Sequence, residues 1–133
     1  MNGELSLCFD SSALVKLVRP ERESDAVQAL LGRSRERYAS ALVRAEVPRA
    51  ARRVGPRAIA RAHLVVDEFD LIEADEVLLA ESTTVGDAAL RTLDAIHLAA
   101  ALSLGDDLDA LVTYDRRLAE AAIQLGITVE APR

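Results

Sequence analysis

Hydrophobic positions change between two spacings along the chain, and each change marks the end of an expected strand or helix. Short apolar runs predict strands at Leu5–Phe9, Tyr38–Ser40, Phe69–Ala74, Ala110–Tyr114 and Ile127–Glu130. Apolar residues three or four positions apart predict helices at Ala13–Val18, Glu21–Arg33, Ala41–Val54, Arg57–Glu68, Asp75–Val85, Arg91–Leu102 and Arg116–Leu125. Strands that alternate with helices throughout indicate an α/β fold, with a mostly parallel sheet of four or five short strands covered on both faces. No repeat or linker interrupts the pattern, so we expect one domain over residues 1–133.

The segment Arg91–Leu102 has the most continuous apolar pattern in the chain. A helix that is hydrophobic on nearly every face is typical of a protein interior. Asp94 lies near the start of this helix, where an ionised carboxylate is costly unless it is paired or partly exposed. Asp94 is therefore either a partly exposed charge in the first helical turn or a ligand for a positive group.

Two of the expected strands are followed at once by an aspartate and then a helix. Asp10 follows the first strand, and Asp115 follows the strand at Ala110–Tyr114. In one parallel sheet both carboxylates would project from the same edge, which is where ligands bind in open α/β sheets. Asp94 and Glu46, each on the inner side of a helix, can converge on that edge.

Four carboxylates packed together would repel one another, and at least one would keep its proton unless a cation were present. Oxygen ligands without cysteine, and without an obvious histidine pair, favour Mg²⁺ or Mn²⁺. Such an ion makes hydroxide available at neutral pH, neutralises a substrate phosphate and stabilises a leaving oxygen. The four acids therefore predict phosphodiester hydrolysis without a nucleophile from the protein.

Two hydroxyl side chains lie two residues from the strand-terminal acids. Ser12 and Thr113 are either a helix cap and a strand residue, or hydrogen-bond partners of the carboxylates or of metal-bound water. His97, one turn after Asp94, is expected to be a helix-packing residue, with a metal or water contact as the alternative. Pro48 removes a helical hydrogen bond, so we expect a bend or a restart just past Glu46.

The formal charge of −6 disfavours a protein that binds nucleic acid by neutralising many phosphates. The few aromatic residues also argue against a surface that stacks bases. Six arginines nevertheless fall between positions 44 and 61, and they form either a solvated helix face or a local rim for a polyanion: Arg44, Arg49, Arg52, Arg53, Arg57 and Arg61.

Cys8 is the only cysteine, which excludes an intrachain disulfide and a thiolate zinc site. It lies in an apolar run and is expected to be a small core residue. No segment has the length and hydropathy of a membrane span, and no basic segment precedes an apolar run at the N-terminus. These features favour a cytoplasmic protein that does not contact membranes.

Four segments of the chain resemble the PIN-domain ribonucleases, and specifically the VapC-type toxins of type II toxin–antitoxin systems. They are FDSSALVKL at Asp10, RAEVPRAAR around Glu46, LRTLDAIHLAAAL at Asp94 and LVTYDRRLAEAA at Asp115. The resemblance implies that these four acids form a quartet around Mg²⁺ or Mn²⁺, with Asp10 and Asp94 as metal ligands and Asp115 in the position that varies most. Ser12 and Thr113 match polar positions beside the acids.

The resemblance further implies a three-layer α/β/α sandwich, a homodimer and endoribonuclease activity on structured RNA such as tRNA or rRNA. It also implies inhibition by a cognate VapB-like antitoxin, which would insert a segment into the acidic groove.

Three other readings fit the sequence less well or remain open. A haloacid-dehalogenase-type phosphohydrolase would have a second acid where Ser12 stands, and a phospho-accepting receiver domain would have a lysine late in the chain. A PIN-like scaffold that only binds a protein partner, without catalysis, remains the alternative from a different functional class.

Overall fold

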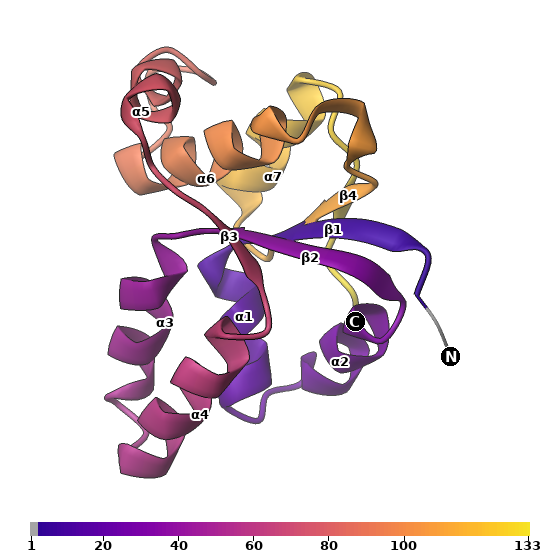
Figure 1. Cartoon of the computed structure of the whole chain (residues 1–133), viewed down its shortest axis with the longest axis vertical. Helices are drawn as coiled ribbons and strands as arrows, with labels where there is room; N and C mark the ends of the chain where they lie inside the picture. The colour runs from indigo at the N-terminus through magenta and orange to yellow at the C-terminus, as the bar shows by residue number, and fades with distance from the viewer. Residues whose placement is uncertain (1–2) are drawn as a thin grey trace.

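The computed structural model describes residues 3–133 as short strands that alternate with helices (Figure 1). The strands are β1 (Leu5–Phe9), β2 (Ser34–Ser40), β3 (Asp70–Ile72), β4 (Ala110–Val112) and β5 (Val129–Glu130). The helices are α1 (Ser11–Val18), α2 (Ser24–Leu31), α3 (Val43–Ala51), α4 (Pro56–Val66), α5 (Glu76–Ser82), α6 (Thr92–Ser103) and α7 (Arg116–Gln124). A short 3-10 turn at Gly105–Asp107 follows α6.

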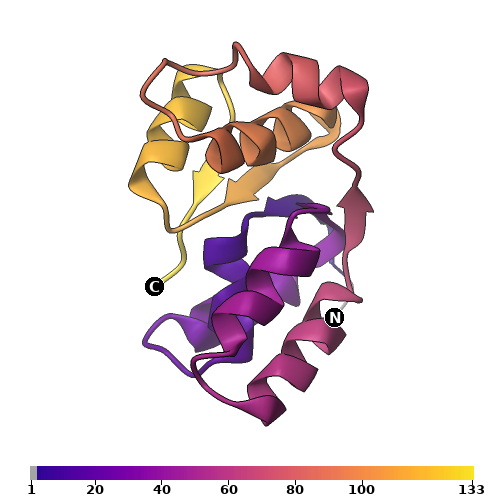
Figure 2. The ribbon, with the colours of Figure 1, turned by 90° about the vertical axis from the view of Figure 1, so that its left-hand side faces the viewer.

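The five strands form one sheet in the order β3-β2-β1-β4-β5, and each pair of neighbours is parallel. Cys8 of the central strand β1 is in register with Tyr38 on one side and Leu111 on the other. Helices α1 to α4 cover one face of the sheet and α5 to α7 cover the other (Figures 1 and 2). The expected α/β/α sandwich is confirmed, and the carboxyl ends of all five strands lie along one edge.

The core is divided by the sheet, and β1 contributes to both halves because neighbouring side chains on a strand point to opposite faces. Leu7 and Phe9 pack among helices α1 to α4, whereas Cys8 packs against α6 and α7. Phe9 meets Phe69 edge to face, with ring centroids 5.2 Å apart. Cys8 is buried, as the sequence predicts.

The middle of helix α6 is fully buried, which confirms the expectation from its apolar pattern. Each residue from Ala95 to Ala101 is buried. The two ends of the helix are more exposed, and Leu93 in the first turn has 49 % of its surface exposed. Among residues 3–133, no helix has both the length and the hydropathy needed to cross a membrane.

Strand β2 begins four residues earlier than the apolar run at Tyr38–Ser40 predicts. Its first half is polar, but its backbone pairs with β1 from Leu5 and Ser34 onward. Main-chain pairing does not require apolar side chains at a partly exposed position, so hydrophobic periodicity does not detect this extension.

Helix α3 is continuous from Val43 to Ala51, so the restart expected just past Glu46 does not occur. Pro48 lacks the N–H that would bond to the carbonyl of Arg44. Arg44 is exposed, so water can supply the missing donor. The loop after α3 turns at Gly55, whose φ of 143° favours glycine, and Pro56 opens α4.

Candidate active site

Asp10 lies at the carboxyl end of the central strand, where β1 passes directly into α1. Its Oδ1 atom accepts hydrogen bonds from the backbone N–H of Ala13 at 3.1 Å and from the Ser12 hydroxyl at 2.7 Å. Its Oδ2 atom accepts a hydrogen bond from the Thr113 hydroxyl at 2.6 Å. Asp10 therefore caps α1, and only 3 % of its surface is exposed.

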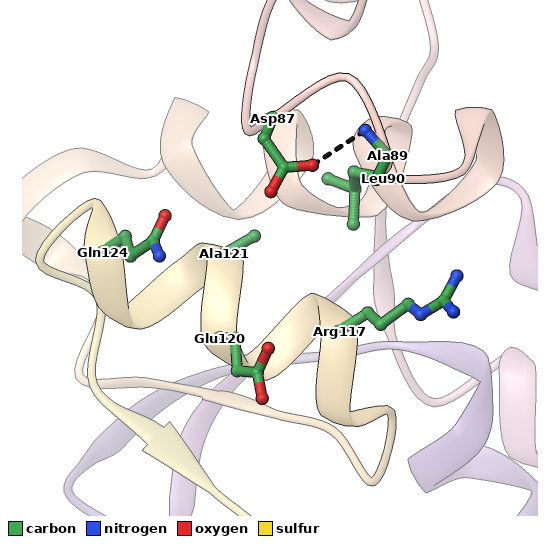
Figure 3. A pocket seen from close by; sticks show the side chains of 7 residues that line it. All are labelled: Asp87, Ala89, Leu90, Arg117, Glu120, Ala121 and Gln124. Carbon is green, nitrogen blue, oxygen red and sulfur yellow. Dashed lines mark hydrogen bonds between the residues drawn. The ribbon is translucent and has the colours of Figure 1, made fainter.

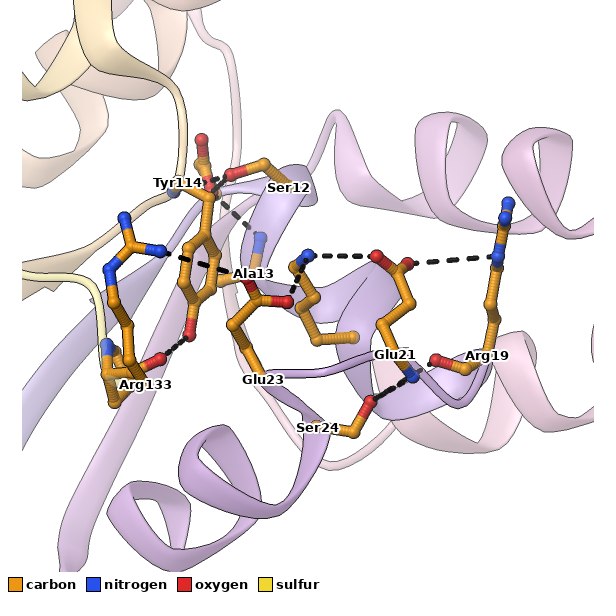
Figure 4. Close-up of polar contacts among 11 residues, drawn as sticks. Ser12, Ala13, Arg19, Glu21, Glu23, Ser24, Tyr114 and Arg133 are labelled. Atoms are coloured by element: carbon orange, nitrogen blue, oxygen red, sulfur yellow. Dashed lines mark hydrogen bonds and ion pairs between the residues drawn. The ribbon is translucent and has the colours of Figure 1, made fainter.

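Ser12 and Thr113 connect the ends of two neighbouring strands through this carboxylate. The backbone N–H of Tyr114 donates to Ser12 Oγ at 2.9 Å (Figure 4), and that of Asp115 donates to Thr113 Oγ1 at 3.0 Å. Of the two roles left open by the sequence, the structure thus favours hydrogen-bonding partners of a carboxylate. Their bonds fix the orientation of Asp10 relative to β4.

Asp115 repeats the construction of Asp10 at the start of α7. Its Oδ1 atom accepts hydrogen bonds from the backbone N–H groups of Arg117 at 2.9 Å and Leu118 at 3.1 Å. Because β1 and β4 are parallel neighbours, Asp10 and Asp115 lie at the same edge of the sheet. The strand–aspartate–helix pattern therefore places both carboxylates as the sequence predicts.

Asp94 lies in the first turn of α6 and is half-buried. Burial raises the pKa of its carboxyl above the usual range, and the negative charge of Asp115 raises it further. His97 opposes this rise, whereas the charge of Asp10 adds to it. Asp94 is thus close enough to both strand-terminal aspartates for their charges to disfavour its ionisation.

Burial also raises the pKa of Asp10, although the hydrogen bonds from Ser12 and Thr113 counteract part of the rise. Ionisation of Asp10 and of Asp94 therefore costs free energy in the folded protein. A cation bound between them would remove that cost.

Glu46 reaches the site from α3 and is paired with His97, for which the sequence predicts a packing role, with a metal or water contact as the alternative. Its Oε1 atom lies 2.7 Å from Nε2 of His97. The imidazole is buried, with 3 % of its side chain exposed, and Glu46 is partly exposed at 24 %. The expected packing role of His97 is borne out by its burial, but the hydrogen bond to Glu46 was missed.

A signal for this pairing was present in the sequence. His97 is the one ring nitrogen donor on a helix that is otherwise apolar around it, and buried polar groups are almost always hydrogen-bonded. Its spacing of three residues from Asp94 puts both side chains on one face of α6. The identity of its partner, 51 positions away, was not encoded locally.

The donor set fits a divalent metal by its chemistry, although it is not a closed cage. Within residues 3–133, no three His, Cys, Asp or Glu side chains are placed so that they alone could hold an ion. Mg²⁺ usually keeps several waters and binds through one or two carboxylates together with substrate phosphates. Asp10 and Asp94, with Asp115 at the same edge of the sheet, would supply oxygen ligands and negative charge to such an ion if it were bound.

A separate cavity of about 270 Å³ lies between α7 and the loop that precedes α6 (Figure 3). Its lining consists of Asp87, Ala89, Leu90, Arg117, Glu120, Ala121 and Gln124. The Asp87 carboxylate accepts a hydrogen bond from the backbone of Ala89 at 2.8 Å (Figure 3). None of the four acids predicted from the sequence lines this cavity.

The C-terminal end of the chain is fixed near α1 by a second polar cluster (Figure 4). Lys16 pairs with Glu21 at 2.8 Å and with Glu23 at 3.0 Å, and its ammonium lies 4.9 Å from the centre of the Tyr114 ring. Glu23 also contacts Arg133 at 3.9 Å. These contacts hold the segment that follows β4, and they do not include the acids of the site.

The chain is similar to known proteins of one family. Residues 7–124 match the family described as PIN domain. The chain is 46 % identical to ribonuclease VapC46 of Mycobacterium tuberculosis, over 96 % of this chain and 98 % of that protein. It is 45 % identical to ribonuclease VapC35 of the same species, over 93 % and 95 % of the two chains.

Two solved structures have the same fold at low sequence identity. The sarcin-ricin-loop-cleaving toxin VapC20 of Mycobacterium tuberculosis aligns with a TM-score of 0.72 at 15 % identity, over 87 % of this chain and 95 % of that one. A toxin–antitoxin complex from Klebsiella pneumoniae contains a chain that aligns with a TM-score of 0.73 at 23 % identity, over 96 % and 98 %. From the family match and the two curated relatives, we conclude that the chain belongs to the PIN domain family and resembles its VapC-type ribonucleases.

Proposed function

We propose that this protein is an endoribonuclease toxin that hydrolyses RNA phosphodiester bonds with Mg²⁺ or Mn²⁺. The observation that carries the proposal is the meeting of Asp10, Asp94 and Asp115 at one sheet edge, where the charges of Asp115 and Asp10 add to the burial that raises the pKa of Asp94. Similarity to proteins named as ribonucleases supports RNA as the substrate.

Asp10 and Asp94 would hold the metal, with Asp115 and Glu46 beside it. A bound divalent ion lowers the pKa of water and neutralises phosphate charge. The chain itself orients the ligands. Ser12 donates a hydrogen bond to one oxygen of Asp10 and Thr113 donates to the other, so the orientation of the carboxylate is fixed from two sides. His97 fixes Oε1 of Glu46, which leaves Oε2 to accept a hydrogen bond from water.

The direct test is incubation of the purified protein with total bacterial RNA in Mg²⁺, in Mn²⁺ and in EDTA. We expect discrete fragments that require metal and that disappear with Asp94→Ala. Asp25→Asn, an exposed acid on α2, is the matched control and should cleave as the wild type does. A fully active Asp94→Ala would contradict the mechanism.

The alternative function is a PIN-like scaffold that binds a protein partner without catalysis. A Mn²⁺ titration distinguishes the two, because a scaffold would give the same binding curve for the wild type and for Asp94→Asn. The proposed enzyme requires that this substitution weaken Mn²⁺ binding, since it removes a carboxylate ligand.

The proposed toxin would be inhibited by a cognate VapB-like antitoxin and would act as a homodimer. The toxin–antitoxin complex from Klebsiella pneumoniae, which contains a chain of the same fold, supports an antitoxin partner. Light scattering of the purified chain tests the dimer: a mass twice that of the 14.3 kDa chain is expected, and a monomer at all concentrations would exclude it.

A further inference from the structure

The end of α3, the turn that follows it and α4 together carry positive charge without a compensating acid. Residues 47–66 contain five arginines and no Asp or Glu, although 22 of the 133 residues in the chain are acidic. A solvated helix face in such an acidic protein would ordinarily mix both signs of charge. The distribution instead concentrates cations in one part of the surface.

Three of these arginines border a hollow of about 510 Å³ at the end of α3, whose lining is Arg49, Ala50, Arg52 and Arg53. We call this surface the arginine hollow. Its three arginines are exposed, and they form no ion pair with any of residues 3–133. Two other arginines nearby have partners within the chain. Arg44 pairs with Glu73 at 2.9 Å, and Arg61 donates to the carbonyl of Leu17 at 2.8 Å.

The arginine hollow is continuous with the candidate active site through α3. Arg49 follows Glu46 by three residues on α3, so the two side chains lie on the same side of the helix, and Arg52 and Arg53 lie in the turn that follows the end of α3 at Ala51. At about 1.5 Å per residue, the Cα atom of Arg49 lies roughly 4.5 Å from that of Glu46 along the helix axis. Figures 1 and 2 show α3 leaving the sheet where β2 ends, with α4 packed beside it.

We propose that the arginine hollow binds the phosphodiester backbone of the RNA substrate and guides it toward the four acids. This inference rests on the proposed ribonuclease function. A chain with a formal charge of −6 and a cluster of carboxylates repels a polyanion, so binding requires a local region of opposite sign. Unpaired guanidinium groups bind phosphate oxygens in pairs of parallel hydrogen bonds.

The composition of the hollow favours RNA backbone over an acidic protein segment. Ala50 is its single apolar lining residue, so it offers no pocket for the large side chains that anchor protein partners. It also has no aromatic ring on which bases could stack. Contacts would therefore be made to phosphates and would be independent of sequence.

The test measures binding of a short labelled RNA in EDTA, where metal-dependent cleavage cannot occur, over a series of salt concentrations. The variant Arg49→Gln/Arg52→Gln/Arg53→Gln removes the hollow's charge while keeping good helix formers. The control Arg22→Gln/Arg33→Gln/Arg35→Gln removes the same charge from exposed residues in the loop after α1, in the turn between α2 and β2, and in β2.

We expect the hollow variant to bind RNA about tenfold or more weakly than the wild type. The slope of log binding constant against log salt concentration should fall in magnitude by about 2, because three phosphate contacts are lost and each contributes about 0.7 to the slope. The control should match the wild type. In the presence of Mg²⁺, the hollow variant should raise KM for RNA cleavage while kcat is retained.

Equal RNA affinity and equal salt slope in the hollow variant and the wild type would overturn the inference. A labelled polyglutamate peptide serves as a second probe. If the hollow variant loses that peptide but keeps RNA, the surface binds acidic protein segments instead. Failure of the wild type to cleave any RNA would refute the proposed function itself, and is a separate result from the loss of RNA binding.

Discussion

Replacing Thr113 by Val removes one hydroxyl from the centre of the site and leaves the side-chain shape almost unchanged. Thr113 is 1 % exposed, donates to Asp10 Oδ2 at 2.6 Å and accepts from the backbone of Asp115 at 3.0 Å. The lost bond to a charged partner and the unpaired N–H together cost about 2 to 4 kcal/mol. For a chain of this size, Tm should fall by roughly 6 to 16 °C.

The substitution should also change how stability depends on pH. The Thr113 hydrogen bond lowers the pKa of Asp10, so its loss raises that pKa further above the value in the unfolded chain. An acid with a raised pKa in the folded state is destabilising once ionised, and the penalty disappears as it is protonated. The free energy of unfolding that Thr113→Val loses relative to the wild type should therefore be largest at neutral pH. This loss should shrink as the pH falls through the raised pKa of Asp10.

Urea denaturation of metal-free protein at several pH values measures this deficit. Thr113→Ser, which keeps the hydroxyl, should recover most of the lost stability and the wild-type pH dependence. If the valine and serine variants had the same free energy of unfolding at neutral pH, the hydrogen bond to Asp10 would not carry the assigned role.

Three other substitutions or treatments give separate tests. Asp94→Asn should raise Tm in EDTA at neutral pH, because it removes a carboxyl whose ionisation is disfavoured by burial and by Asp115. This gain in Tm should vanish below about pH 4, where the Asp94 carboxyl of the wild type is protonated in both the folded and the unfolded chain. His97→Gln should lower kcat/KM for RNA cleavage by about 10- to 100-fold by releasing Glu46, whereas His63→Gln, at an exposed position on α4, should not. Burial raises the pKa of the Cys8 thiol to about 12, so iodoacetamide should label it only after unfolding, as mass spectrometry would show.

Asp10 and Asp115 were predictable from sequence because both the strand and the acid that ends it are local features. Parallel strands bring their carboxyl ends together whatever the loop lengths, so two such patterns suffice to predict a shared edge. Asp94 was predictable for a related reason, since a charge on a nearly uniform apolar helix stands out.

The features that sequence reasoning missed depend on contacts between distant segments. The pairing of Glu46 with His97 joins α3 to α6, and nothing beside either residue indicates the partner. The polar first half of β2 becomes a strand because β1 lies next to it, and its own side chains do not indicate this. The hydrogen bond that Ser12 accepts from the backbone of Tyr114 likewise depends on β4 lying next to β1.

The most direct test of the account is the cleavage rate of one labelled RNA against Mg²⁺ concentration, for the wild type, Asp10→Asn and Asp25→Asn. Asp10→Asn keeps the size of the side chain and removes the charge that would hold the metal. The account predicts that Asp25→Asn follows the wild-type curve and that Asp10→Asn loses cleavage at all Mg²⁺ concentrations. Cleavage by Asp10→Asn at the wild-type rate, or wild-type cleavage that persists in EDTA, would contradict a metal-dependent mechanism at this site.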